Sequence, residues 1–91
     1  MTIQSVAKRE VNRMQEILPA VKRSKKGEHL LDFANRYASD SKYFLSKSKY
    51  IEAFEAAIIA WAYVDIGLKL KLLSVPDSFK KHFTIWLSTG S

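Results

Sequence analysis

The sequence has 91 residues, which is enough for one small domain but not for two independent cores. Its hydrophobic content of 47% suffices for a packed core and excludes global disorder, and the absence of cysteine excludes disulfides, thiolate chemistry and cysteine-ligated zinc. The net charge is +6, and most of the excess lies in residues 1–27, where seven Lys or Arg face two Glu.

An amphipathic helix is predicted over residues 2–18. Its apolar side chains recur at steps of three and four residues, as on one face of a helix. They are Ile3, Val6, Ala7, Val11, Met14, Ile17 and Leu18. Pro19 lacks an amide hydrogen, so the helix should end or kink near Leu18. The stretch KRSKKG, residues 22–27, is typical of a solvated connector.

A second helix is predicted over residues 28–46 and a third over residues 49–72. The polar break SKSK, residues 46–49, separates them without Gly or Pro. At 100° per residue, one face of the third helix carries Ile51, Phe54, Ile58, Trp61, Ala62 and Leu72, while the opposite side carries Ala53, Ala56, Ala60 and Gly67. A helix that is apolar nearly all round is buried on more than one side, and the small residues would let another element approach closely.

The C-terminal segment, residues 75–87, begins like a helix. Ser74 could cap it, Pro76 suits a first turn and Asp77 complements the helix dipole. FTIWL, residues 83–87, reads as a short extended segment or an apolar tail, and STGS at the end should fray.

These elements predict an all-α fold in a single domain, residues 1–91. We expect a three-helix up-and-down antiparallel bundle, with a short C-terminal helix or apolar tail packed on it. The second apolar side of the third helix then needs a cover, supplied either by the C-terminal segment or by a second copy of the protein.

The middle of the chain, from RYASDSKYF to YIEAFEAAIIAWAYVDIGLKLKLL, resembles the archaeal family called domain of unknown function 357. The matching positions are Tyr37, Asp40, Tyr43, Phe44, Ala53, Phe54, Ala56, Ala60, Ala62, Asp65 and Leu72 or Leu73. The resemblance covers roughly residues 30–75 and implies a small three-helix bundle in an archaeal cytoplasm. SKSK stands where relatives tend to have Gly-Asp, and LKLKLL replaces a Gly-bearing end, so the third helix could run longer. An uncharacterised family implies no activity.

Asp65 is the most unusual residue, because it lies on the apolar face of the third helix. A buried carboxylate without partners is costly. Lys69, four residues on, is one candidate partner, and the hydroxyl of Tyr37 or backbone amides are others. Tyr37, Asp40 and Asp65 therefore form a candidate polar cluster, either structural and fixing helix register or a binding site. The aromatics Tyr37, Phe44, Phe54 and Trp61 are predicted to lie in the core.

The sequence offers little chemistry. Two carboxylates on a close-packed bundle lack the cleft that acid–base catalysis needs, so we expect no enzyme. His29 and His82 lie far apart in the sequence, so no metal site and no cofactor are expected. The longest uncharged run, residues 56–64, is far short of the roughly 20 residues that span a bilayer, and no secretory signal is evident. We therefore expect a soluble cytoplasmic protein without a membrane partner.

Two functions remain open at this point. The first is a non-enzymatic protein-interaction or scaffold module, which could form a homodimer through the small-residue side of the third helix and the C-terminal segment. The alternative is a nucleic-acid-associated accessory protein that uses the basic patch Lys22, Arg23, Lys25 and Lys26 together with the first helix. The same patch would also serve as a solvated connector.

Overall fold

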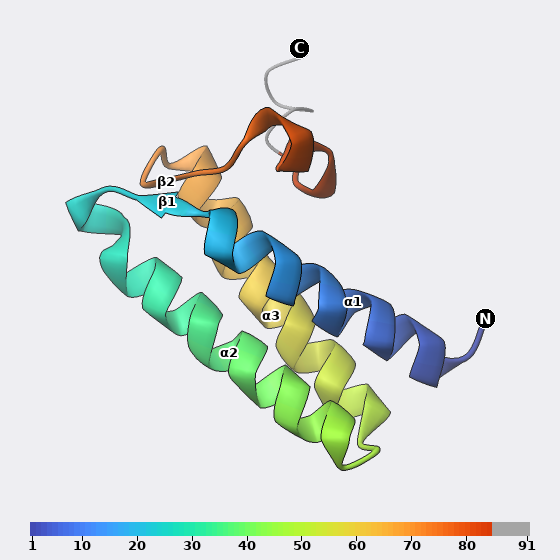
Figure 1. Cartoon of the computed structure of the whole chain (residues 1–91). Coiled ribbons are helices and arrows are strands. Elements are labelled where there is room, and N and C mark those ends of the chain that lie inside the picture. Colours follow the sequence, from blue (N-terminus) through green and yellow to red (C-terminus); the bar gives the residue numbers. More distant parts are fainter. Residues whose placement is uncertain (85–91) are drawn as a thin grey trace.

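In a computed structural model, which describes residues 1–84, three long helices pack along one another and a small ladder of two strands closes one end (Figure 1). The helices are α1 (Ile3–Ile17), α2 (Glu28–Ser46) and α3 (Tyr50–Lys69). The strands β1 (Lys22–Arg23) and β2 (Leu73–Ser74) pair antiparallel, and short 3₁₀ helices cover Leu18–Ala20, Lys25–Gly27 and Asp77–His82. The helices run up, down and up, which confirms the predicted all-α bundle. Residues 85–91, including the predicted tail residues 85–87, lie outside the described part.

Helix α1 begins at a capping box. The Ser5 amide donates to Thr2 Oγ1 at 3.1 Å, and the Thr2 amide donates to Ser5 Oγ at 3.1 Å, so two amides at the helix start are satisfied. The helix ends at Ile17, and Pro19 lies in the 3₁₀ turn that follows, as its missing amide hydrogen predicts. The predicted apolar face is confirmed in its centre, where Ala7, Val11, Met14 and Ile17 are buried, but Ile3 is exposed.

Helices α2 and α3 both end in a left-handed residue that is not glycine. Ser48 has φ 58°, and the Lys49 amide donates to the Phe44 carbonyl at 2.9 Å across it. Lys71 has φ 60°, and the Leu72 amide donates to the Gly67 carbonyl at 2.8 Å. Both are Schellman motifs, which satisfy free carbonyls at a helix end. The third helix, predicted over about residues 49–72, therefore ends three residues earlier, at Lys69, and Lys71 reverses the backbone just after it.

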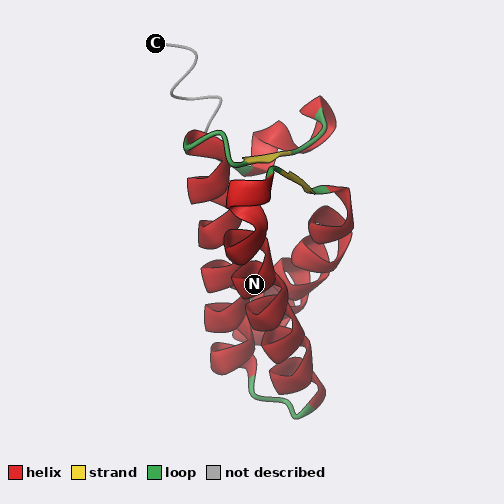
Figure 2. Cartoon of the chain, turned by 90° about the vertical axis from the view of Figure 1, so that its left-hand side faces the viewer, coloured by secondary structure: helices red, strands yellow, loops and turns green. Residues whose placement is uncertain are grey.

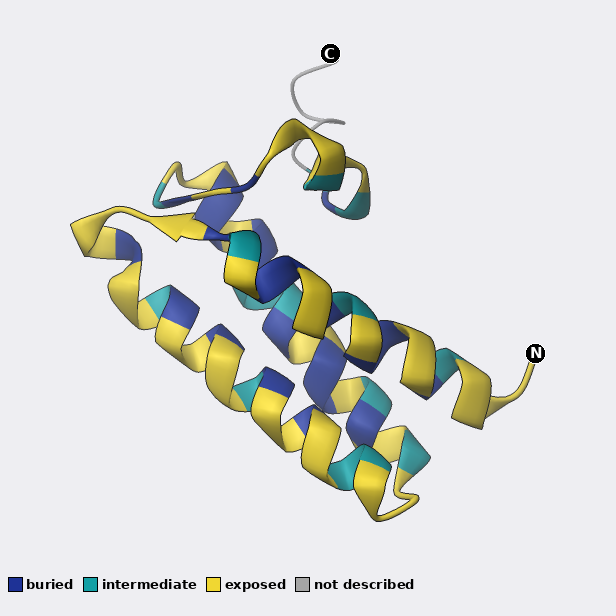
Figure 3. Cartoon of the chain, in the orientation of Figure 1, coloured by how far each residue is buried: buried dark blue, intermediate teal, exposed yellow. Residues whose placement is uncertain are grey.

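The face of α3 that packs inside the bundle is the one that carries its small residues. Ala53, Ala57, Ala60, Val64 and Gly67 are buried, whereas Ile51 and Ile58 of the predicted core face are exposed. The bulk comes from α1, whose Val11, Met14 and Ile17 are among the largest fully buried side chains. Small residues on α3 let the neighbouring helices approach closely, and this close packing outweighs the burial of larger side chains. We call Ala53, Ala57 and Ala60 the alanine line. Figure 3 shows in dark blue that the buried residues of all three helices lie where the helices face one another.

This packing also answers where the small-residue side points. It faces α1 and α2, so the expectation that a second copy docks on it is wrong. A Cβ atom added at Gly67 would lie 2.4 Å from Leu73 Cδ1, which identifies Leu73 as the close neighbour. The aromatics Tyr37, Phe44, Phe54 and Trp61, predicted as core, are only partly buried and line its margin.

The connector and the C-terminal segment meet at the closed end of the bundle (Figure 2). Lys22 pairs with Ser74 and Arg23 with Leu73, so the connector is held in a strand rather than freely solvated. Ser74 is consequently a strand residue and not the predicted helix cap. The helix expected from Pro76 onward is a 3₁₀ helix that ends at His82.

Candidate functional site

The buried carboxylate Asp65 binds the C-terminal segment. The Thr84 amide donates to Asp65 Oδ1 at 2.9 Å, and the Thr84 hydroxyl donates to Asp65 Oδ2 at 2.9 Å. Lys69 Nζ lies 3.4 Å from Oδ2, which confirms the pair expected from the i, i+4 spacing. A backbone amide, a hydroxyl and an ammonium group together satisfy a carboxylate that is only 5% exposed.

Trp61 provides a second attachment for the same segment. Its indole Nε1–H donates to the His82 carbonyl at 2.7 Å, and its ring stacks on Phe83 with the centroids 6.0 Å apart and the planes 5° apart. Phe83 is buried, so the segment is packed and not merely tethered. Either the C-terminal segment or a second copy was expected to pack on the third helix. In the structure, the C-terminal segment packs on the side of α3 that carries Trp61 and Asp65.

The structure does not join Tyr37, Asp40 and Asp65 by hydrogen bonds anywhere in residues 1–84. Tyr37 stacks on Tyr63, with 5.8 Å between ring centroids, and Phe33 stacks on the same ring at 5.4 Å. Asp40 is exposed on α2. The predicted polar cluster is therefore wrong as a unit: Asp65 acts with Thr84, whose role nothing in its local sequence signals.

The four basic residues Lys22, Arg23, Lys25 and Lys26 are all exposed. One more lysine lies near them, because the end of α3 is bonded to the connector. The Ser24 amide donates to the Leu72 carbonyl at 3.0 Å, which places the preceding residue, Lys71, beside the connector. We call these five residues the basic end. Contacts between distant segments create it, so the sequence alone could only find the first four.

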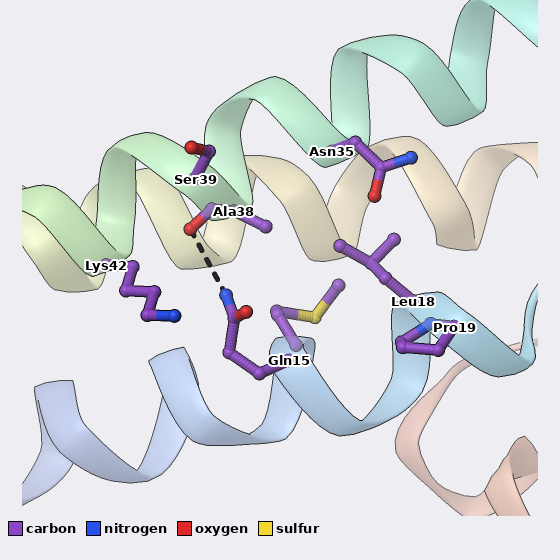
Figure 4. Close-up of a pocket in the computed structure, with 8 residues that line it drawn as sticks. Gln15, Leu18, Pro19, Asn35, Ala38, Ser39 and Lys42 are labelled. Carbon is purple, nitrogen blue, oxygen red and sulfur yellow. Dashed lines mark hydrogen bonds between the residues drawn. The ribbon is translucent and has the colours of Figure 1, made fainter.

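A groove of about 420 Å³ opens between α1 and α2 (Figure 4). Gln15 crosses it with an Nε2–H that donates to the Ala38 carbonyl at 3.4 Å. The complete lining is Met14, Gln15, Leu18, Pro19, Asn35, Ala38, Ser39 and Lys42. Lys42 is the one charged side chain in that lining, so the groove holds no pair of groups for acid–base chemistry.

The outward side of α3 carries a line of residues at steps of three and four. They are Ile51, Glu55, Ile58, Ala62, Ile66 and Lys69, and we call them the α3 outer face. Ile51 is 60% exposed, Ile66 48% and Ile58 36%. A shallow apolar hollow of about 310 Å³ adjoins the line and is lined by Ile59, Ala62, Tyr63 and Ile66. The apolar face predicted for the third helix included Ile51, Ile58 and Ala62, together with Phe54, Trp61 and Leu72, but not Ile66.

Metal ligands and membrane spans are two further features that bear on the site. Within residues 1–84, no group of three or more His, Asp or Glu side chains lies close enough to hold a metal ion. In the same part of the chain, no helix combines the length and the apolar character needed to cross a bilayer.

Comparison with known proteins supports the fold. A family model described as "Protein of unknown function (DUF357)" matches residues 4–73. The chain is similar to the crystal structure of protein AF1782 from Archaeoglobus fulgidus, which carries the same family model, with 28% sequence identity and a TM-score of 0.73 over 81% of this chain and 93% of that chain. Among curated proteins there is no significant match. The resemblance seen in the sequence is confirmed, and it extends through α1.

Proposed function

The chain belongs to the DUF357 family of proteins of unknown function, and because that family brings no activity with it, we propose a function from the surface. The chain is a non-enzymatic protein-interaction module, and its α3 outer face receives a helix of a partner. The observation that carries this proposal is the line of exposed isoleucines on α3.

Single exposed apolar residues are ordinary, but aligned ones are not. Ile51, Ile58 and Ile66 share one stripe of a helix whose opposite side is already packed in the bundle. An amphipathic helix of a partner would bury such a stripe by placing its own apolar residues at steps of three and four. Glu55 and Lys69 flank the isoleucines with opposite charges, which would fix the direction of the partner helix.

We propose no catalytic role for the groove between α1 and α2. Its lining offers amides, one hydroxyl and one ammonium group, without a carboxylate or imidazole to exchange protons with a substrate. Asp65 is the buried acid of α3, and its oxygens are occupied by Thr84 and Lys69. Neither this groove nor Asp65 therefore offers a free carboxylate or imidazole for proton exchange.

The test compares two isoleucines of equal exposure. Ile66 on the α3 outer face and Ile3 on α1 are both 48% exposed, so Ile66→Arg and Ile3→Arg are matched. A partner captured by the tagged chain from its native cells is purified and titrated against all three proteins by calorimetry. We expect Ile3→Arg to bind like the original chain and Ile66→Arg to lose at least about tenfold in affinity.

Equal binding by Ile66→Arg and the original chain would contradict the proposal. So would the absence of any partner, including a second copy, whose binding Ile66→Arg weakens. Circular dichroism of both variants provides the check that the helices remain folded.

The alternative function, contact with a nucleic-acid backbone, is favoured by the basic end. Lys71 adds one charge to the four of the connector. Phosphate contacts of this kind give an affinity that falls steeply with salt. Fluorescence polarisation of a labelled single-stranded RNA, at about 50 mM and about 200 mM salt, tests it. Binding that is absent at both concentrations, or unchanged in a Lys25→Glu/Lys26→Glu variant, eliminates this alternative.

A further inference from the structure

The part of the α3 outer face from Glu55 to Lys69 is centred on Ala62. Ile58 and Ile66 lie four residues before and after Ala62. Glu55 and Lys69 lie seven residues before and after it. This part of the line is thus symmetric in its isoleucines and complementary in its charges, while Ile51 lies outside it.

We infer that the partner helix is α3 of a second copy of this chain, packed antiparallel with Ala62 on a twofold axis. This inference rests on the proposed function. Ile58 of each copy packs on Ile66 of the other, and Glu55 of each copy pairs with Lys69 of the other. A twofold interface uses the same patch on both subunits, so each contact occurs twice.

Charge decides the direction of the two helices. In a parallel arrangement with the same residues aligned, Glu55 would face Glu55 and Lys69 would face Lys69, and like charges across an interface suppress association. The antiparallel arrangement turns both repulsions into attractions. A second copy therefore fits this face better than a helix without charges at these two positions.

The residue on the axis is small. Ala62 is half-buried between its larger neighbours Ile58 and Ile66, so two helices can approach each other closely at their crossing point. A larger residue there would meet its own copy and hold the helices apart. In the antiparallel arrangement, the two Ala62 residues meet at the crossing point. On either side of it, Ile58 of one copy packs on Ile66 of the other.

Asp65 already holds the side chain of Lys69 in place before a second copy binds. Its ammonium group lies 3.4 Å from Asp65 Oδ2 while its side chain stays 45% exposed, so it can contact a second carboxylate without leaving the first. A side chain that is already held loses less conformational entropy when it forms a new pair. The buried Asp65 thereby links the attachment of the C-terminal segment to the proposed interface.

The interface is one helix wide. From Glu55 to Lys69, the stretch that the two antiparallel helices share, it extends over about 21 Å at 1.5 Å per residue. Interfaces of this size belong to the small end of the specific range. We therefore expect a dimer that dissociates at roughly micromolar concentrations, which requires a titration rather than a single measurement.

The first test is sedimentation velocity of the complete chain from about 1 µM to about 500 µM. We expect the mass to double across this range. Glu55→Lys and Lys69→Glu should each weaken the dimer by about tenfold or more, and an equimolar mixture of the two variants should restore it, because the mixed pair regains both attractions. The matched control is Glu16→Lys on α1, which makes the same charge change away from α3 and should leave the dimer intact.

The second test uses the fact that the chain has no cysteine. Residues on a twofold axis bring their Cβ atoms within disulfide distance, so Ala62→Cys should form a disulfide-linked dimer on mild oxidation. Glu55→Cys is the control. Its two copies would be about 21 Å apart in the antiparallel arrangement and should not form a disulfide, although they would do so in a parallel one.

Three outcomes overturn the inference: a constant monomer mass at the highest concentration, crosslinking of Glu55→Cys, or no rescue in the mixture while Glu55→Lys alone is monomeric. A chain ending at Thr84 that dimerises, beside a complete chain that stays monomeric, also overturns it and identifies residues 85–91 as the occupant. If the chain is monomeric but loses another partner through Ile66→Arg, this inference fails and the proposed function stands. If no such partner exists either, both fail.

Discussion

Asp65 connects two parts of the chain that are 19 residues apart in sequence. Its carboxylate accepts hydrogen bonds from the backbone amide and the hydroxyl of Thr84. This carboxylate on an apolar helix face therefore holds the C-terminal segment on α3. Trp61 reinforces the attachment through His82 and Phe83. The buried carboxylate of α3 thus has a structural use.

We predict that replacing Asp65 separates these contributions. Asp65→Asn keeps an oxygen that can accept from the Thr84 amide, and it should lower the free energy of unfolding by about 1 kcal/mol. Asp65→Leu removes every acceptor and should cost about 2–3 kcal/mol while it releases Phe83 from Trp61. Urea unfolding measures the cost, and Trp61 fluorescence in a Trp86→Phe background reports the release. Equal stability of the original chain and Asp65→Leu would contradict this role.

His82 makes the same attachment sensitive to pH. Partial burial, followed by the nearby positive charge of Arg13, lowers the pKa of His82 below its ordinary value of 6.5. The unfolded chain therefore binds a proton more tightly than the folded chain. The stability due to a neutral His82 is complete above pH 6.5 and is lost as the pH falls below that value.

The free energy of unfolding should consequently fall between about pH 7.5 and about pH 5.5. His82→Gln, which cannot titrate, should show a shallower slope over the same range. Urea titrations at several pH values measure both slopes. A variant with an unchanged slope would assign the pH dependence to other groups.

At the scale of elements, the two Schellman motifs explain how the chain turns without glycine. Ser48 and Lys71 adopt the left-handed conformation, which costs an L-residue about 1–2 kcal/mol. The backbone bonds across each helix end and the packing of the bundle offset this cost. The polarity of SKSK correctly located the break between α2 and α3. What ends α2 is the left-handed conformation of Ser48, which the sequence does not announce with a glycine.

Glycine at either position should stabilise the protein. Ser48→Gly and Lys71→Gly remove the steric conflict of the left-handed conformation but increase the entropy of the unfolded chain. We expect a net gain of about 0.5–1 kcal/mol for each variant in chemical denaturation. Ser46→Gly, inside the last turn of α2, is the control and should destabilise, since its conformation is helical. A loss of stability at both left-handed positions would contradict the argument.

At the scale of the whole molecule, the sequence predicted the bundle but not its inner side. The steps of three and four in α1 identified Val11, Met14 and Ile17 correctly, because α1 has one apolar face and one charged face. Helix α3 is apolar nearly all round, so periodicity could not say which side faces inward. Larger side chains suggested Ile51 and Ile58, whereas close helix packing selects the alanine line.

The candidate site was predictable to a similar degree. Asp65 and Lys69 form a local pair, and their spacing along one helix was sufficient to find it. Thr84 and the extension of the basic end by Lys71 depend on contacts between distant segments, which no periodic pattern records. The α3 outer face was present in the sequence as a stripe, but its exposure depends on how the three helices are rotated about their axes.

The alanine line also allows a prediction of how larger side chains on α3 change the stability of the protein. Most cores lose stability when a large side chain is truncated, but here the inner side of α3 is lined by small buried side chains. Ala60→Leu should cost at least about 3 kcal/mol, because α1 and α2 would have to move apart along their length. Ala62→Leu, two residues away on the outer face, should cost less than about 0.5 kcal/mol at concentrations where the chain is monomeric. Thermal unfolding of the two variants compares them directly, and similar losses would contradict the assignment of the inner side.

This arrangement has a consequence for how sequences of this fold can diverge. A core of large side chains can drift, since one loss of volume is compensated by a gain nearby. A core whose spacing is set by Ala53, Ala57 and Ala60 has no room in which to make such exchanges. Variation is then confined to the outward residues, and the surface by which the molecule meets its partners becomes the part that evolution can alter most freely.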